Sequence, residues 1–231
     1  MKSDYHMSYF HNMNNLQELN MGITERKTRE RILRKEQIIN AAKSVFLEKG
    51  FSGATIEDIA KEAELSVGTL YIYFKNKDDL YASLNLRALD ILNQEMDKIL
   101  RDTKLSSGEK LDGAWEGLYK TFSLDPIALR AILHFQLEES LKLLSPPLLA
   151  SINEVSKSII NKLALIFQIG IDKGKFRKAN TMAMADIFWG VFTGLVLWED
   201  AKRRINPKKD YLRPTLKLAL EIIEKGVQRE E

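Results

Sequence analysis

Residues 54–81 read "ATIEDIAKEAELSVGTLYIYFKNKDDLY" and contain two short helical patterns joined by the link "AELS". Thr55 is a favourable N-cap for the first pattern, and Ser66 is one for the second. The second pattern opens with small residues, which let the N-terminal end of a helix approach base edges in a major groove. Two short helices with so brief a connection predict a helix-turn-helix unit.

The side chains of this unit suit contacts with duplex DNA. Small residues at the start of the second helix can meet base edges, while tyrosine hydroxyls and lysine ammonium groups can reach phosphate oxygens. For any single residue the alternative is a plain helical bundle with half-buried tyrosines and solvated lysines. The candidate DNA contacts are Thr55, Ser66, Val67, Gly68, Thr69, Tyr71, Tyr73, Lys75 and Lys77.

Helical periodicity continues on both sides of this unit. Upstream, one apolar face is formed by Ile38, Ala41, Ala42, Val45 and Phe46, and Gly50 can end that helix in a left-handed conformation. Downstream, a helix from near Lys77 to about Leu100 has the apolar stripe Leu80, Leu84, Leu92, Met96 and Ile99. Further helical segments follow, separated by prolines and by the "DKGKF" turn. We therefore expect an all-α protein with about nine helices.

Composition limits the classes of protein that fit. The chain of 231 residues has no cysteine, which excludes disulfides and thiolate metal sites and favours the cytoplasm. The stretch "MADIFWGVFTGLVLW" is shorter than a membrane-spanning helix needs, so we expect no membrane segment. The formal net charge of +3 does not by itself mark a nucleic-acid-binding protein.

Charge is concentrated near the N-terminus. The segment 24–35, "TERKTRERILRK", is rich in Arg and Lys and can lie along phosphates, or it can be an exposed helical turn with its own Glu–Arg pairs. Residues 1–23 lack periodicity, and we expect them to be a disordered leader.

The segment "GATIEDIAKEAELSVGTLYIYFKNKDDLY", with the preceding "QIINAAKSVFLEKGF", resembles the DNA-binding signature of the tetracycline-repressor (TetR) family of bacterial transcriptional regulators. The resemblance covers about residues 34–83. It implies a three-helix DNA-binding domain over 24–78 and a helical ligand-binding and dimerisation domain over 79–231. The implied function is a ligand-responsive repressor that binds a palindromic operator as a homodimer. The family's contact pattern falls on Thr55, Ser66, Val67, Thr69, Tyr71, Tyr73 and Lys77.

One residue departs from the family's pattern. Glu64 stands in the turn between the two helices, where the family often has glycine. A non-glycine residue at positive φ costs about 1 kcal/mol or more. Either this turn has a different geometry or its strain is tolerated.

The second half of the chain carries many aromatic residues, which favours a large apolar cavity, although ordinary core packing is the alternative for each of them. An apolar cavity selects a hydrophobic effector such as an acyl chain, an acyl thioester or an aromatic lipophile. Tyr119, His134 or Gln136 would hold its polar end, while Glu138 and Glu139 leave a cationic drug open. The candidate ligand-binding residues are Trp115, Tyr119, Phe122, His134, Phe135, Gln136, Phe167, Phe188 and Phe192.

The last two helical segments favour a dimer interface. "MAMADIFWGVFTGLVLW" is apolar on nearly all sides, and "YLRPTLKLALEIIEKGV" offers a matching stripe of Leu216, Leu220 and Ile223. A four-helix interface between two protomers would cover both segments.

Enzymatic function is not expected. The sequence has no P-loop, no glycine-rich dinucleotide motif, no nucleophile elbow and no Glu-x-x-His pair, so we expect neither a metal site nor a cofactor. The alternative function is a helical carrier of lipophiles, or a scaffold protein, that does not bind DNA.

Overall fold

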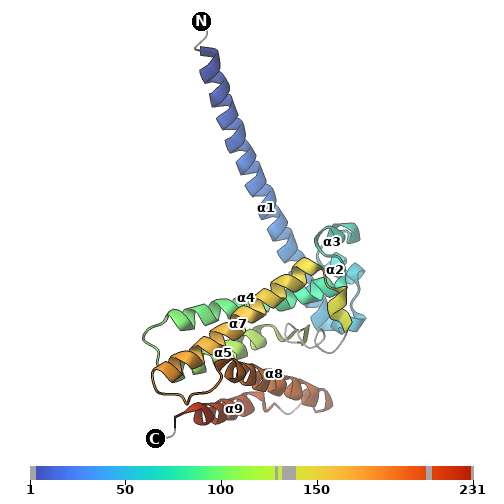
Figure 1. Ribbon diagram of the computed structural model, residues 1–231. Coiled ribbons are helices and arrows are strands. Elements are labelled where there is room, and N and C mark those ends of the chain that lie inside the picture. The colour runs from blue at the N-terminus through green and yellow to red at the C-terminus, as the bar shows by residue number, and fades with distance from the viewer. Residues whose placement is uncertain (1–3, 128–129, 132–138, 207–209, 230–231) are drawn as a thin grey trace. The chain divides into compact units, whose positions relative to one another are not determined.

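The computed structural model describes residues 4–127, 130–131, 139–206 and 210–229 (Figure 1). Within these residues the chain forms eight α-helices, one 3₁₀ helix and no strand beyond an isolated bridge between Phe176 and Gln228. The all-α fold is therefore confirmed. The chain divides into two units, Met1–Lys75 and Asn76–Glu231. The sequence had placed this division after residue 78.

The first unit contains α1 (Asp4–Gly53), α2 (Ile56–Glu62) and α3 (Val67–Tyr73). Where the sequence favoured a disordered leader, the structure has helix from Asp4 onward, and no proline interrupts this segment. Near its end α1 is broken at Gly50, whose φ is 70°. The positive φ agrees with the expected break, although the ψ of 172° is extended rather than left-handed helical.

The core of the first unit is built from the faces that periodicity predicts. α1 contributes its apolar stripe, α2 contributes two residues beside the small Ala63, and α3 contributes Leu70, with Phe74 directly after it. Gln37 Nε2 donates a hydrogen bond of 2.8 Å to the carbonyl of Ala63, which joins α1 to the end of α2. The buried residues from α1 and α2 are Ile38, Ala41, Ala42, Val45, Phe46, Ile59 and Ala60.

Glu64, in the turn between α2 and α3, has the left-handed backbone conformation that favours glycine. Its φ is +53°, and it is the one non-glycine residue with positive φ in the described part of the chain. The Glu64 N–H donates to the carbonyl of Lys61 at 3.0 Å. The Leu65 N–H donates to the carbonyl of Ala60 at 2.9 Å. These two bonds form a Schellman motif with glutamate at the position that glycine favours, so the turn has the left-handed geometry and its strain is tolerated.

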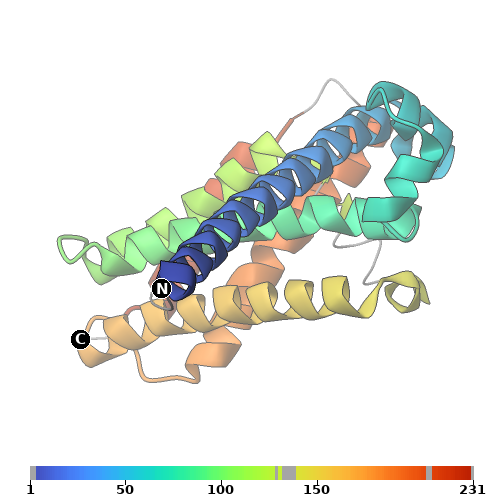
Figure 2. The ribbon, with the colours of Figure 1, turned by 90° about the horizontal axis from the view of Figure 1, so that it is seen from above.

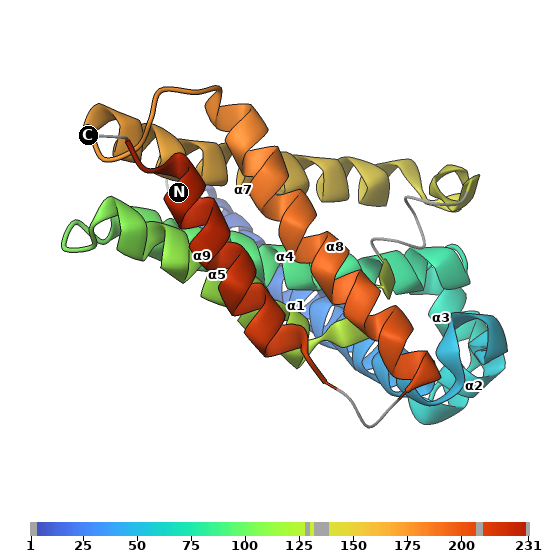
Figure 3. The same cartoon turned by 90° about the horizontal axis from the view of Figure 1, so that it is seen from below.

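The second unit is a layered bundle (Figures 2 and 3). Its elements are α4 (Lys77–Arg101), α5 (Ser107–Leu124), the 3₁₀ helix η1 (Glu139–Leu143), α7 (Pro146–Asp172), α8 (Thr181–Ile205) and α9 (Leu212–Val227). α4 packs against α5 and α7, and α8 packs against α7 and α9. In Figure 2 α7 lies alongside α4.

Aromatic rings fill the centre of this bundle. Trp115 meets the rings of Phe188 and Phe192 edge-on, with centroids 4.8 and 5.3 Å apart. Phe167 meets Phe188 in the same way, at 6.0 Å. All four rings are buried. They belong to the interior of the bundle, and edge-on pairs of this kind add to the stability gained by burial.

The end of α7 depends on two glycines. Gly174 has a φ of 66° and closes a Schellman motif, with the Lys175 N–H donating to the carbonyl of Gly170 at 2.9 Å. At Gly170 a Cβ atom would lie 2.0 Å from the ring of Phe176. Only a residue without a side chain therefore allows Phe176 to fold back under α7.

α8 is longer than the apolar stretch on which the membrane argument rested. Residues Thr181–Arg203 are long and apolar enough to cross a membrane by length and composition alone, and 28% of the most apolar window is buried in the unit. The expectation that this segment is too short to span a membrane was therefore wrong. Much of the apolar surface of α8 is not buried within the unit.

Candidate nucleic-acid interface and effector cavity

The start of α3 is held by its own hydroxyl groups. Ser66 accepts a hydrogen bond of 3.1 Å from the Thr69 N–H, as an N-cap should. The two side-chain oxygens are also 2.8 Å apart and share a hydrogen bond. Ser66 therefore has a structural role in capping α3, in addition to the DNA contact expected of it.

One face of α3 is open to solvent. Tyr71 is 55% exposed, and the opposite side of the helix is buried through Leu70. Ile72 is 70% exposed and adds an apolar side chain to this face. Ile72 was not among the DNA contacts predicted from the sequence. The available signal was that it directly follows Tyr71 on the predicted recognition helix. An exposed face with Tyr71 and Ile72 suits contacts with bases and sugars.

The N-terminus of α2 is fixed by a capping box. Thr55 Oγ1 accepts from the Asp58 N–H at 3.1 Å, and Asp58 Oδ2 accepts from the Thr55 N–H at 3.2 Å. Lys49 lies 2.7 Å from the other carboxylate oxygen of Asp58. The hydrogen bond from Lys49, followed by those from Thr55, lowers the pKa of Asp58 below its usual value.

A basic groove of about 610 Å³ runs between α1 and the end of α3. Its cationic residues Lys27, Arg31 and Arg34 come from the charged segment of the sequence, and Tyr73 and Ile72 contribute from α3. The cationic segment is therefore helical, and a tyrosine predicted to contact DNA lies beside it. Such a groove suits a phosphate backbone.

The predicted DNA contacts fall in both units of the chain. Lys75 is the last residue of the first unit, whereas Lys77 is the first residue of α4 and belongs to the second. The others all belong to the first unit and comprise Thr55, Ser66, Val67, Gly68, Thr69, Tyr71 and Tyr73.

Two adjoining cavities lie in the second unit, and both are lined by Asn85, Leu89 and Trp189. The narrower one, of about 30 Å³, lies between α4, α5 and α8. The wider one, of about 380 Å³, lies between α4, η1, α7 and α8. The larger volume is in the range of small-molecule sites. Both cavities share one face of α4, so a ligand in either one would contact that helix directly.

The predicted ligand-binding residues are distributed unevenly around these cavities. Phe122 and Phe192 line the narrower one. Tyr119 lies instead in a groove between α5 and α9, where Arg213 stacks 4.8 Å above its ring. Core residues that line neither cavity are Trp115, Phe167 and Phe188. His134, Phe135 and Gln136 lie outside the described residues.

Asn85 is a buried polar residue among the lining residues that sequence reasoning missed. It is 4% exposed on the apolar face of α4, and its Oδ1 atom accepts no hydrogen bond from the described part of the chain. The available signal was a polar residue in register with Leu89 and Leu92 on an otherwise apolar stripe.

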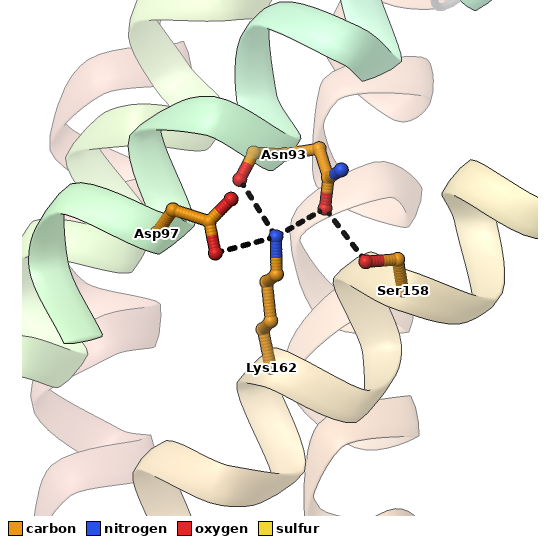
Figure 4. A network of polar contacts seen from close by, with 4 residues as sticks. All are labelled: Asn93, Asp97, Ser158 and Lys162. Atoms are coloured by element: carbon orange, nitrogen blue, oxygen red, sulfur yellow. Dashed lines mark hydrogen bonds and ion pairs between the residues drawn. The ribbon is translucent and has the colours of Figure 1, made fainter. Parts of the chain in front are cut away.

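Polar contacts join the C-terminal part of α4 to the middle of α7 (Figure 4). Lys162 Nζ from α7 donates to Asn93 Oδ1 at 2.8 Å and pairs with Asp97 Oδ1 at 2.8 Å. Ser158 Oγ donates to the same Asn93 oxygen at 3.0 Å. The ammonium of Lys162 lowers the pKa of Asp97 through this hydrogen bond. These contacts fix the position of α4 along α7.

A second set of contacts holds the first turn of α4. Asn76 Nδ2 donates to the carbonyl of Leu143 at 3.0 Å. The Ser145 N–H donates to Asp79 Oδ1 at 2.7 Å, and the Asp79 side chain is buried. The segment 143–145 begins with the last residue of η1, and Leu144 within it and Leu141 before it line the wider cavity. The cavity wall is thus hydrogen-bonded to the start of α4.

A helix-turn-helix unit with an exposed second helix, followed by a helical unit with an apolar cavity on α4, defines a class of two-domain, helical DNA-binding regulators. Residues 38–84 match the family of bacterial regulatory proteins, tetR family. The fatty acid metabolism regulator protein of Bacillus subtilis is 31% identical over 151 residues, which are 64% of this chain and 74% of that protein. The chain belongs to the tetR family and is a transcriptional regulator.

Two further comparisons extend across most of the chain. The crystal structure of the regulator FadR from Bacillus subtilis in complex with stearoyl-CoA is 26% identical, has a TM-score of 0.64, and covers 84% of this chain and 99% of its own. The negative transcriptional regulator IcaR of the biofilm operon of Staphylococcus epidermidis is 26% identical over 146 residues, or 62% of this chain and 75% of that protein. These relatives are regulators of transcription.

Proposed function

We propose that this regulator is a repressor that binds a palindromic operator as a homodimer and is released by a hydrophobic effector with an acyl chain. The observation that carries the proposal is an apolar cavity built directly against α4, the helix that follows the DNA-binding unit in the chain. A ligand there contacts the helix that directly follows the DNA-recognition helix α3 in the chain.

DNA recognition is assigned to the exposed side of α3. Tyr71 reaches the duplex from the open face, and the small residues Gly68 and Thr69 allow the start of the helix to enter the major groove. Thr55 presents the N-terminus of α2 to a phosphate. We assign the cationic groove of α1 to the neighbouring phosphates, because it brings together three positively charged side chains.

The effector is assigned from the chemistry of the cavity walls. In the wider cavity Leu89, Leu144 and Ile152 are typical of a lining that selects an acyl chain. The stearoyl-CoA bound by the Bacillus subtilis FadR supports an acyl thioester as the effector class for this chain.

Homodimerisation is assigned to α8 and α9. Ile187, Trp198 and Ile205 follow one another along the exposed side of α8, and Trp198 is 64% exposed. Leu218 and Ile222 form a matching exposed stripe on α9. Large exposed apolar surfaces of this kind mark protein interfaces, so a second copy covering both helices explains why α8 is apolar yet little buried. A cytoplasmic location follows from this function.

The proposed mechanism is a population shift between two positions of α4. Two recognition helices must lie about 34 Å apart to enter successive major grooves. A ligand that fills the wider cavity displaces Leu141 and Leu144, and the bonds from this segment to Asn76 and Asp79 carry the displacement to the first turn of α4. The half-site spacing is then lost and DNA affinity falls.

An electrophoretic mobility shift with the DNA upstream of the protein's own gene tests the DNA-binding part. The expected result is a discrete complex that survives competitor DNA at physiological salt. Only weak binding that salt abolishes would instead indicate a helical carrier of lipophiles.

A further inference from the structure

We propose that the Asn85 amide recognises the polar group of the effector, and that the site selects a neutral acyl derivative, a thioester or an amide, over the free fatty acid. This inference rests on the proposed function, since it concerns the same cavity. It assigns the specificity to a side chain of α4 itself.

Asn85 lies where the two cavities adjoin, because it lines both of them together with Leu89 and Trp189. Its Oδ1 atom is buried and accepts no hydrogen bond within the described residues. A buried polar atom without a partner is destabilising, so a residue of this kind on an apolar helix face calls for a role other than packing. A bound ligand at the junction of the cavities would supply the missing partner.

The described lining of the two cavities contains negatively charged side chains and no positively charged one. Among the described residues that line the two cavities there is no Lys, Arg or His. The charged residues present are Asp125 in the narrower cavity and Asp186 in the wider one, whereas the candidate ligand-binding residues from the sequence include no carboxylate. A fatty acid carboxylate would meet these carboxylates and no cation in the lining, so the hydration that it loses on entering would not be compensated by a positive charge. The lining therefore favours a neutral ligand over the free acid.

The hydrogen-bonding groups of an acyl-pantetheine match those of the Asn85 amide. An Asn amide donates from Nδ2 and accepts at Oδ1. A thioester carbonyl accepts one hydrogen bond, and the amide N–H groups of a pantetheine arm donate others. A neutral acyl-pantetheine can therefore satisfy both ends of the Asn85 side chain, while its acyl chain lies along Leu89 and Ile152 in the wider cavity. Because Asn85 belongs to α4, this contact also acts directly on the helix that the effector must move.

The test measures binding by calorimetry with dodecanoyl-pantetheine, dodecanoate and S-dodecyl-pantetheine, a thioether that lacks the carbonyl. The wild-type protein should bind the thioester at least about tenfold more tightly than dodecanoate, because the carboxylate is desolvated without a cation. It should bind the thioether about two- to twelvefold more weakly than the thioester, as expected for one lost hydrogen bond. This comparison of ligands needs no variant.

The variant Asn85→Leu should weaken thioester binding by a similar two- to twelvefold factor, remove the preference over the thioether, and leave the melting temperature unchanged or higher. Asn153→Leu is the matched control, because Asn153 lines the wider cavity but is exposed and already hydrated. This control should bind all three ligands as the wild type does.

Three results would overturn the assignment. Asn85 is structural if its leucine variant melts at a lower temperature and keeps the wild-type ligand preferences. Equal affinity for thioester and free acid, or tighter binding of dodecyltrimethylammonium, would refute the selection of a neutral ligand. Failure of the proposed effector class is a separate outcome: no acyl ligand would then bind, although the protein still shifted its operator.

Discussion

Replacing Glu64 by glycine should stabilise the protein, since the left-handed conformation of this residue is its only departure from an otherwise regular turn. Its φ is +53°, and both hydrogen bonds of the Schellman motif come from backbone groups that glycine retains. A residue with a Cβ atom loses roughly 1–2 kcal/mol in this conformation. Glycine gains that amount but loses about 0.4–1 kcal/mol through the larger freedom of the unfolded chain. The difference between these two ranges is about 0–1.6 kcal/mol, and the middle of it, about 0.8 kcal/mol, is the expected net stabilisation.

Thermal and urea-induced unfolding measure this effect. The variant Glu64→Gly should melt about 1–4 °C higher than the wild type. Gly174→Ala is the matched control, because Gly174 holds the same position in the Schellman motif at the end of α7, with a φ of 66°. That substitution should destabilise the protein by about 1 kcal/mol. If Glu64→Gly lowers the free energy of unfolding while Gly174→Ala behaves as expected, Glu64 is not strained and our account of this turn is refuted.

Three other variants and conditions test the remaining parts of the account. Tyr71→Ala should weaken operator binding at least tenfold without changing the melting temperature, because the ring is exposed; a loss of thermal stability would mean that the ring is core. Gly170→Ala should destabilise the protein by about 1–3 kcal/mol, since the new Cβ overlaps the ring of Phe176, whereas Gly117→Ala, whose Cβ would meet Leu92 and Met96 at an ordinary contact distance of 3.8 Å, should stabilise it by up to about 1 kcal/mol in unfolding experiments. Acid should reduce stability as the pH falls through the lowered pKa of Asp58, because the unfolded state binds this proton more readily, and Asp58→Asn should remove that part of the loss in a pH series of unfolding curves.

Periodicity was sufficient to predict most of the fold. The apolar face of α1 and that of α4 are buried where the 3.6-residue repeat places them, since a helix can bury only one stripe against its neighbours. The N-caps Thr55 and Ser66 were also correctly predicted, because capping is a local interaction of the chain with itself. The helical state of the residues after Asp4 was not predicted, since that segment has no apolar period.

The cavity was harder to predict than the fold. Trp115, Phe167 and Phe188 turned out to be core, because an aromatic residue at helical spacing gives the same signal whether it fills space or surrounds it. The shape of the cavity depends on how α4, α7 and α8 are spaced, which no single helix encodes. Asn85 was recognisable only as an interruption of an apolar stripe, and its missing hydrogen-bond partner is a property of the folded chain.

An acyl ligand in the cavity should release this regulator from DNA. The fluorescence anisotropy of a labelled operator fragment, titrated with acyl thioesters of increasing chain length, measures this release most directly. Each added methylene should strengthen release about fourfold, corresponding to about 0.8 kcal/mol, until the cavity is full. Release that does not depend on chain length, or that occurs with lipophilic cations but not with acyl thioesters, would contradict the account.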